Sequence, residues 1–421
     1  MGNYIKKVLK NGVKLYLYID PNMRRTYVDY AVDYGSNGKF FKFYYQDKLY
    51  EVLPGCAHFL EHMLGEHSKY GNLYKEFSDK KYSVNAATYL DTTKYYFCGT
   101  EDVLDSIKKL IHIVDDPVFT IDDVNKTRYA IIEETKRTLN NKYSANLNLA
   151  IHNLYQDLNI FDESLSTIGD EETTKRLDYQ MLKLCYDAFY YDENKSLLIA
   201  GNFDEEEMIN YVESIYKELK PHKKELKLYD YANLDKIKVK EETRYLNVSE
   251  DLVSIAFKEN INDYLKKEIN IYTRFIFQSK LYKETKFNEK LIKDSIISYI
   301  GVRWTLNIDD NNFLIVIGAS VKKTKVYLNR LIKELKINNF KKEDFELFKK
   351  TLIADEAGKI DYKYNVFNNF QNERQYTDDF DEIEFFKTLS FDRFLKFYNK
   401  LNFDDYTVAI FKSNEEDNCS K

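Results

Sequence analysis

Residues 55–64 read GCAHFLEHML, and this stretch carries most of the chemistry visible in the sequence. Its apolar spacing and the preceding Pro-Gly pair predict a helix that begins near Gly55. His58 and His62 are four residues apart, so a helix places both imidazoles on one face. Two neutral imidazoles at that spacing are typical ligands of Zn²⁺. The sequence therefore predicts a zinc site on this helix.

Glu61 projects from nearly the same face, because it follows His58 by three residues. Its carboxylate can reach a zinc-bound water without binding the metal, and zinc lowers the pKa of such a water to about 7. Glu61 can then take the proton and pass it to the leaving amine. The pattern HxxEH is the signature of inverzincin metallopeptidases. We therefore expect a zinc-dependent peptide hydrolase with Glu61 as its catalytic residue.

A catalytic zinc site also needs a third protein ligand and one open position. A helix predicted at residues 121–140 offers two carboxylates, Glu133 and Glu134, within the run AIIEETKR. The adjacent Ile131 and Ile132 are expected to face packing partners, so at least one glutamate points to the opposite side. The residue pattern alone leaves both glutamates open as the ligand.

Alternating and helical apolar patterns cover most of the chain. The expected strands are residues 14–19, 27–34, two within 81–99, and 195–201; the expected helices are 101–115, 121–140, 145–157, 171–190 and 204–218. The charged stretch after Pro221 has no apolar periodicity, and a strand pattern resumes at residues 244–248. Residues 221–239 are therefore interpreted as a linker.

The second half of the sequence contains a segment similar to one in the first half, which indicates an internal repeat. Residues 110–134 can be placed over residues 331–355 without a gap, and Leu110 then meets Leu331. We therefore predict an α+β protein of two similar domains, each a mostly antiparallel sheet covered by helices. Residues 1–220 would form the catalytic zinc-binding domain and residues 240–421 a homologous non-catalytic domain, since only the first copy contains HFLEH.

The composition excludes several classes of protein. Hydrophobic residues make up 44% and charged residues 31%, as in a soluble globular protein. The net charge of -6 provides no basic field for nucleic acid. The first residues have no apolar core long enough for a signal peptide, and no window approaches 18 uncharged apolar residues. We therefore expect a cytoplasmic protein without a membrane span.

The sequence resembles the pitrilysin/insulinase family of zinc peptidases. The resemblance rests on Tyr34-Gly35-Ser36, Gly55–Leu64, Asn85-Ala86 with Thr88, Asp116-Pro117 with Phe119, Ile132-Glu133-Glu134, and Tyr190 with Asn194 ahead of Leu197–Gly201. It implies that Glu134 is the third zinc ligand. It also implies that Asn85 lies near a strand edge where the backbone of a peptide substrate binds.

The resemblance further implies a partner, because two such chains usually form a clamshell, as a homodimer or with a metal-free homologue. Two departures weaken the expectation of a self-sufficient enzyme. The family's accessory glutamate, seven residues before the third ligand, falls on Thr127. A substrate-binding arginine of the second half has no counterpart within residues 279–299. The expected function is an endopeptidase acting on peptides or unfolded segments; the alternative is a catalytically silent or weakly active subunit of a heterodimeric peptidase.

Overall fold

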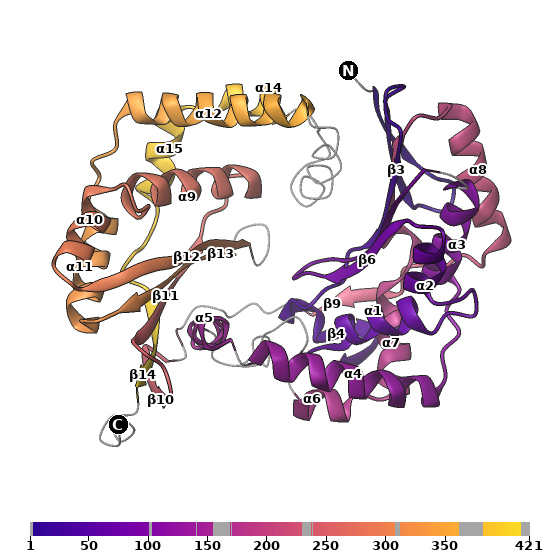
Figure 1. Cartoon of the computed structure of the whole chain (residues 1–421), viewed down its shortest axis with the longest axis horizontal. Coiled ribbons are helices and arrows are strands. Elements are labelled where there is room, and N and C mark those ends of the chain that lie inside the picture. The colour runs from indigo at the N-terminus through magenta and orange to yellow at the C-terminus, as the bar shows by residue number, and fades with distance from the viewer. Residues whose placement is uncertain are drawn as a thin grey trace. The chain divides into compact units, whose positions relative to one another are not determined.

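The computed structural model describes residues 3–100, 103–139, 141–154, 169, 171–229, 237, 239–307, 312–361 and 382–413. The chain divides into two compact units, Met1–Asn140 with Ser164–Ala232, and Asn141–Glu163 with Asn233–Lys421. Each unit combines a β-sheet with helices (Figure 1), which confirms the predicted α+β class. In the part of the chain that is described, no helix has the length and apolar character needed to cross a bilayer.

The first unit is built on a six-stranded sheet with the order β1-β2-β8-β3-β7-β6. Its strands are β1 (Asn3–Val8), β2 (Lys14–Ile19), β3 (Thr26–Val32), β6 (Ser83–Thr88), β7 (Thr93–Gly99) and β8 (Lys195–Gly201). Neighbouring strands are antiparallel except β2 and β8, which are parallel. β8 is buried along its whole length, which explains its nearly continuous apolar sequence.

A smaller sheet joins β4 (Lys42–Tyr45) to β5 (Lys48–Glu51) and β9 (Leu226–Leu228) in the same unit. Gln46 and Asp47 connect β4 and β5 with positive φ at both residues, as a two-residue hairpin turn requires. β9 falls within the stretch interpreted as a linker, so the beginning of that stretch is a strand of the first unit. Residues 230–236 and 238 of the expected linker lie outside the described residues.

The helices of the first unit are α1 (Cys56–Glu66), α2 (Leu73–Asp79), α3 (Val103–Asp115), α4 (Ile121–Leu139), α6 (Glu171–Arg176), α7 (Tyr179–Phe189) and α8 (Glu205–Glu218). α1 packs against β6, β7, α4 and α7. This placement brings α1 and α4 together although about sixty residues separate them in the chain. The stretch 171–190, expected as one helix, is two helices: α6 ends at Arg176, and Asp178 caps the start of α7 by accepting a hydrogen bond from the Met181 backbone amide (2.8 Å).

The second unit has a five-stranded sheet with the order β10-β14-β11-β13-β12. Its strands are β10 (Glu241–Leu246), β11 (Asp251–Asn260), β12 (Ile297–Asn307), β13 (Asn312–Val321) and β14 (Tyr406–Ser413). Its helices are α5 (Lys142–His152), α9 (Lys266–Lys280), α10 (Lys286–Lys293), α11 (Thr324–Lys336), α12 (Lys342–Asp361), α14 (Glu382–Thr388) and α15 (Phe391–Tyr398). β10 and β14 are parallel, and the other neighbours are antiparallel.

α5 belongs to the second unit although its residues precede position 220. It packs on the sheet face that carries small side chains, where Leu147 lies against Gly318. Asn146 fastens the helix there: it accepts a hydrogen bond from Ser254 Oγ (2.6 Å) and donates one to the Ala409 carbonyl (3.2 Å). The second unit therefore includes a segment of the first half of the sequence.

The two units repeat one topology. Read in chain order, β2, β3, β6, β7 and β8 occupy the same sheet positions as β10, β11, β12, β13 and β14, and the parallel pair β2–β8 corresponds to the parallel pair β10–β14. The first sheet has one more strand, β1, beyond β2. α3 and α11 begin at residues 103 and 324, and α4 and α12 at 121 and 342. Both separations are 221 residues, the same as between Leu110 and Leu331, which are both buried. The internal repeat predicted from the sequence therefore corresponds to a structural repeat.

Candidate metal centre

Gly55 precedes α1 as its N-cap, and its φ of 88° lies in the left-handed region that glycine adopts without strain. The helix that follows is short but deeply packed, with nine of its 11 residues buried. It therefore fixes the backbone of His58, Glu61 and His62 firmly. The two imidazole rings lie next to each other edge to face, with centroids 4.7 Å apart and planes at 74°, and this proximity follows from the four-residue spacing.

Glu134 reaches the two histidines from α4. Its Oε2 lies 3.8 Å from His58 Nε2 and 3.4 Å from His62 Nε2. Glu133, one residue earlier, is rotated away and pairs with Lys136 (2.9 Å) on the exposed side of the helix. Of the two glutamates that the sequence offered, the structure thus brings Glu134 to the histidines.

The donor set fits a zinc ion. One ligand atom from each of His58, His62 and Glu134 lies within 4.8 Å of the others. Tetrahedral ligands about 2.0–2.1 Å from zinc are roughly 3.4 Å apart, close to the two separations between Glu134 and the histidines. Two imidazoles and one carboxylate also match the ligand types of hydrolytic zinc sites, which leave a fourth position open.

The two histidines differ electrostatically. Burial, reinforced by the neighbouring His62, lowers the pKa of His58 to about 4, although Glu134 opposes this. Burial also disfavours the charge on His62, but hydrogen bonds to Glu134 and Glu66 outweigh it and raise the pKa to about 10. His58 is thus neutral at neutral pH, the form in which imidazole binds a metal. Metal binding at His62 would release a proton.

Glu61 is buried beside these groups, with 5% of its surface exposed. Thr88 Oγ1, at the end of β6, donates a hydrogen bond to Glu61 Oε2 (2.7 Å). Burial raises the pKa of the Glu61 carboxyl group, and the Thr88 bond partly counteracts this effect. Thr88 therefore orients the carboxylate and helps to keep it ionised. This contact of Thr88 with Glu61 was not predicted from the sequence, because 27 positions separate the two residues.

Asn85 lies on β6, three residues before Thr88, and its side chain is exposed. Its Nδ2 donates a hydrogen bond to the Tyr96 hydroxyl (3.2 Å) on β7. β6 is the last strand of its sheet and, among the described strands, pairs with β7 alone. Asn85 is therefore at a sheet edge, but it is not among the three clustered ligand candidates.

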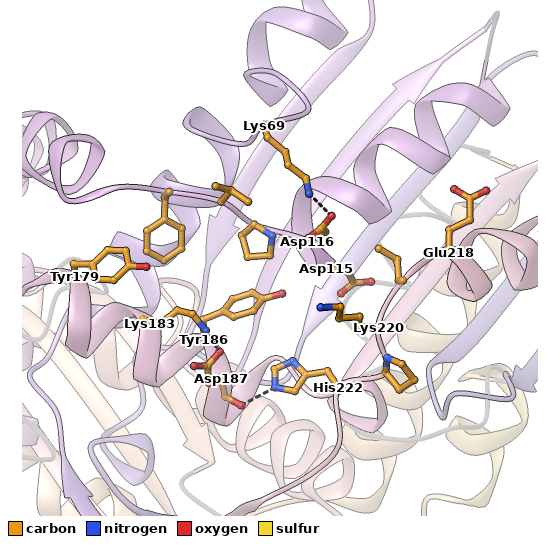
Figure 2. Close-up of a pocket in the computed structure, with 15 residues that line it drawn as sticks. Lys69, Asp115, Asp116, Tyr179, Lys183, Tyr186, Asp187, Glu218, Lys220 and His222 are labelled. Atoms are coloured by element: carbon orange, nitrogen blue, oxygen red, sulfur yellow. Dashed lines mark hydrogen bonds and ion pairs between the residues drawn. The ribbon is translucent and has the colours of Figure 1, made fainter.

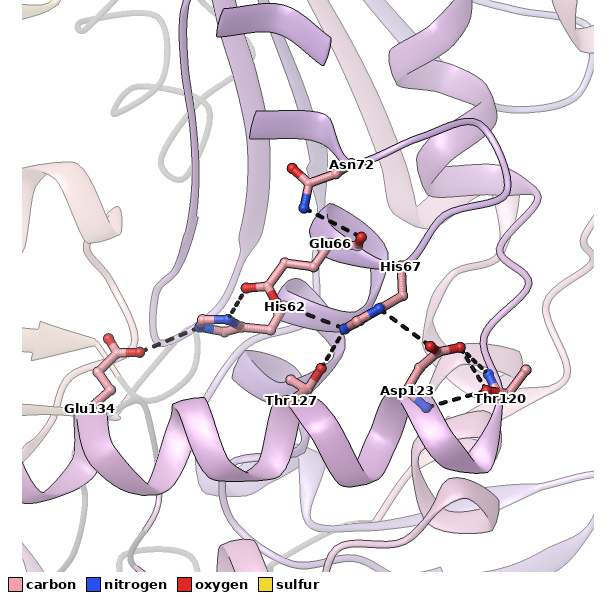
Figure 3. Close-up of polar contacts among 8 residues, drawn as sticks. All are labelled: His62, Glu66, His67, Asn72, Thr120, Asp123, Thr127 and Glu134. Carbon is pink, nitrogen blue, oxygen red and sulfur yellow. Dashed lines mark hydrogen bonds and ion pairs between the residues drawn. The ribbon is translucent and has the colours of Figure 1, made fainter. Parts of the chain in front are cut away.

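Glu66 and His67 extend the polar contacts from the histidines toward the start of α4 (Figure 3). Glu66 Oε1 lies 2.8 Å from His62 Nδ1, and His67 Nε2 lies 2.9 Å from Thr127 Oγ1. His67 Nδ1 is also 3.4 Å from Asp123 Oδ1. The sequence predicted no role for Glu66 or His67, although the four-residue spacing of His62 and Glu66 is a signal for contact on a helix.

A separate cavity of about 730 Å³ lies elsewhere in the first unit (Figure 2). Its polar wall includes Lys69 with Asp116, and His222, whose Nε2 lies 2.7 Å from the Asp187 carbonyl. None of the residues that line it is His58, Glu61, His62 or Glu134. The cavity is therefore distinct from the candidate metal centre, and its size alone gives it no catalytic role.

Comparison with known proteins adds independent findings. Residues 50–167 match the family model described as Insulinase (Peptidase family M16), and residues 176–352 match the one described as Peptidase M16 inactive domain. The uncharacterised zinc protease YmfH of Bacillus subtilis is 28% identical over 267 residues, which is 62% of this chain and 60% of that relative. The match thus spans less than two thirds of the relative's length.

Solved structures show the same fold over nearly the whole chain. An M16-like peptidase from Alicyclobacillus acidocaldarius superposes with a TM-score of 0.85 at 19% identity, covering 98% of this chain and 99% of that one. A protease from Helicobacter pylori gives a TM-score of 0.77 at 17% identity, covering 98% of this chain and 100% of the other. At these identities the structures establish a shared architecture of two domains.

Proposed function

Because this chain belongs to the pitrilysin/insulinase family of peptidases, we propose that it is a zinc-dependent endopeptidase. The observation that carries the proposal is the convergence of three ligand atoms from His58, His62 and Glu134 within 4.8 Å of one another. Glu61 is a buried carboxylate on α1, the helix that carries both histidines, and it is not one of the three ligand candidates. This combination suits metal-assisted hydrolysis.

In the proposed reaction, His58, His62 and Glu134 hold the metal. When bound there, zinc would supply Lewis acidity and lower the pKa of water to about 7. Glu61 takes a proton from the attacking water and delivers it to the leaving amine nitrogen. Its burial favours this exchange, because a raised pKa brings a carboxylate closer to the pH at which it both accepts and donates protons. Thr88 holds the carboxylate in place during the transfer.

The proposed substrate is a peptide or an unfolded protein segment in extended conformation. The exposed edge of β6 supports this, since an extended chain can add to a free strand edge through backbone hydrogen bonds. Asn85 lies on that edge and is the proposed substrate-binding side chain. We further propose a second subunit of the same fold, either a copy of this chain or a metal-free homologue.

The test is cleavage of a mixed peptide library by the zinc-loaded chain, with and without a chelator. Activity should disappear with the chelator and return with zinc. Glu61→Gln should retain zinc and lose about 10²–10⁴-fold in rate, because it removes the proton carrier. Glu133→Gln, an exposed neighbour of the ligand Glu134, is the matched control and should cleave as the wild type does. Full activity of Glu61→Gln would refute the mechanism.

The alternative function, a catalytically silent or weakly active subunit, predicts a different outcome. The chain would then bind zinc and turn over no peptide, alone or mixed with a homologous subunit. The match of residues 176–352 to a model described as an inactive domain begins in the first unit, continues into the second, and does not include HFLEH. It does not bear on His58, Glu61, His62 or Glu134, all of which precede that region.

A further inference from the structure

The side chain of Glu66 contacts the face of His62 that is turned away from the candidate metal position (Figure 3). Glu66 Oε1 lies 2.8 Å from His62 Nδ1, while His62 Nε2 lies 3.4 Å from Glu134 Oε2. Glu66 is the last residue of α1 and follows His62 by four positions, so both side chains lie on one helical face. One imidazole therefore bridges two carboxylates through its two nitrogens.

This geometry selects a tautomer. A neutral imidazole carries one N–H and one lone pair, and an ionised carboxylate can only accept a hydrogen bond. In the neutral form of His62 that binds a metal, the hydrogen stays on Nδ1, which Glu66 contacts at 2.8 Å, and Nε2 keeps the lone pair. Nε2 is the nitrogen that faces Glu134 and the space between the ligands. The contact thus prepares His62 for metal binding and also fixes the plane of its ring.

His58 is held differently. Its Nδ1 is buried and has no hydrogen-bond partner among the described residues, and only 6% of the residue is exposed. Packing inside α1 and its neighbours is therefore what restrains His58. His62 is more exposed, with 17% of its side chain accessible against 8% of the His58 side chain, and packing restrains it less. A hydrogen bond therefore restrains the ring of His62 more than it would restrain the ring of His58, and Glu66 provides this hydrogen bond.

The hydroxyl of Thr127 on α4 does not take this role, because it bonds His67 rather than His62. The restraint on His62 therefore comes from its own helix. We propose that Glu66 is a positioning residue that holds His62 in the tautomer and ring orientation needed for metal binding. This inference rests on the proposed zinc-binding function and adds to it a residue that neither binds the metal nor transfers a proton to the substrate.

The test measures zinc affinity directly, by competition with a chromogenic chelator, in the full-length chain. Glu66→Gln keeps the size of the side chain and removes its charge, and it should weaken zinc binding roughly 10- to 100-fold. Glu76→Gln is the matched control: Glu76 lies in the same unit, is partly exposed and pairs with Lys109 (2.8 Å) away from the ligands. Its zinc affinity should equal that of the wild type.

Two further measurements separate positioning from a merely structural role. The thermal midpoint of the metal-free chain should be similar for Glu66→Gln and Glu76→Gln, and the visible spectrum of the Co²⁺-substituted chain should change only for Glu66→Gln. Wild-type zinc affinity in Glu66→Gln, with zinc still bound by the wild type, would overturn this inference alone. Failure of the wild type to bind zinc would overturn the proposed function and the role of Glu66 together.

Discussion

Glu259 offers a test of the electrostatics of the second unit. It lies near the end of β11 with 3% of its surface exposed. Both of its carboxylate oxygens accept a hydrogen bond from the backbone N–H of Asn402 (3.0 Å each). No cation pairs with it among the described residues. Burial raises the pKa of its carboxyl group to about 8, Asp405 adds to this, and the Asn402 bond opposes it. Glu259 is therefore mostly protonated in the folded chain at neutral pH.

The sign of the pH effect follows from linkage. In the unfolded chain the carboxyl group titrates near its ordinary pKa of about 4.3, so between that value and about 8 the folded state binds the extra proton. The stability that this proton provides is complete below the unfolded pKa and is lost as the pH rises through the folded one. At about 1.4 kcal/mol for each pKa unit, the full loss is on the order of 5 kcal/mol.

The perturbation is Glu259→Gln, which removes the titration and keeps an acceptor for the Asn402 amide. Trp304, the single tryptophan of the chain, lies on β12, so its fluorescence during urea denaturation reports on the second unit. The wild type should lose stability relative to Glu259→Gln as the pH is raised from 5 to 8.5. Glu241→Gln, at an exposed position on β10, is the control and should follow the wild type. A constant difference between wild type and Glu259→Gln at every pH would refute the reasoning.

Two further predictions concern the metal centre. Glu134→Gln should weaken zinc binding by more than roughly 100-fold, the upper effect of losing a residue that only hydrogen-bonds to a ligand, because Glu134 is proposed to bind the metal itself. Glu133→Gln should leave zinc affinity unchanged, and equilibrium dialysis measures both variants. Equal affinities of the two variants would exclude Glu134 as a ligand. Thr127→Val removes a buried hydroxyl that is hydrogen-bonded to His67 Nε2, and it should lower the free energy of unfolding of the metal-free chain by about 1–2 kcal/mol. Thermal denaturation followed by circular dichroism measures the effect. An unchanged midpoint would show that this hydrogen bond does not stabilise the fold.

Much of the fold could be predicted from the sequence, because local patterns record local structure. The strands at Lys14–Ile19 and Lys195–Gly201 and the helix from Cys56 lie where the apolar spacing places them. The repeat was visible because α3 and α11 keep the same buried positions. The assignment of α5 was not predictable, since an amphipathic pattern indicates that a helix packs but not which sheet it packs against. Only the three-dimensional match between Leu147 and Gly318 reveals that it joins the second unit.

Some features of the candidate site could likewise be predicted from the sequence, and others could not. The spacing of His58, Glu61 and His62 follows from one helical turn and was predicted from the sequence. Glu133 and Glu134 could not be separated by pattern alone, because neighbours on a helix differ by about 100° and the pattern does not fix which direction faces α1. The family resemblance pointed to Glu134, and the structure brings that residue to the histidines. The role of His58, His62 and Glu134 as metal ligands stays a prediction.

The remaining contacts of the site join distant parts of the chain. Thr88 lies 27 positions from Glu61, and Thr127 lies 60 positions from His67, so neither pair could be predicted from local spacing. Both depend on how α1 packs against β6 and α4. Thr127 and Glu134 are also seven residues apart on α4, about two turns, and so share one face. We therefore expect that a substitution that loosens the packing of α4 at Thr127 also moves Glu134 and lowers the affinity for zinc.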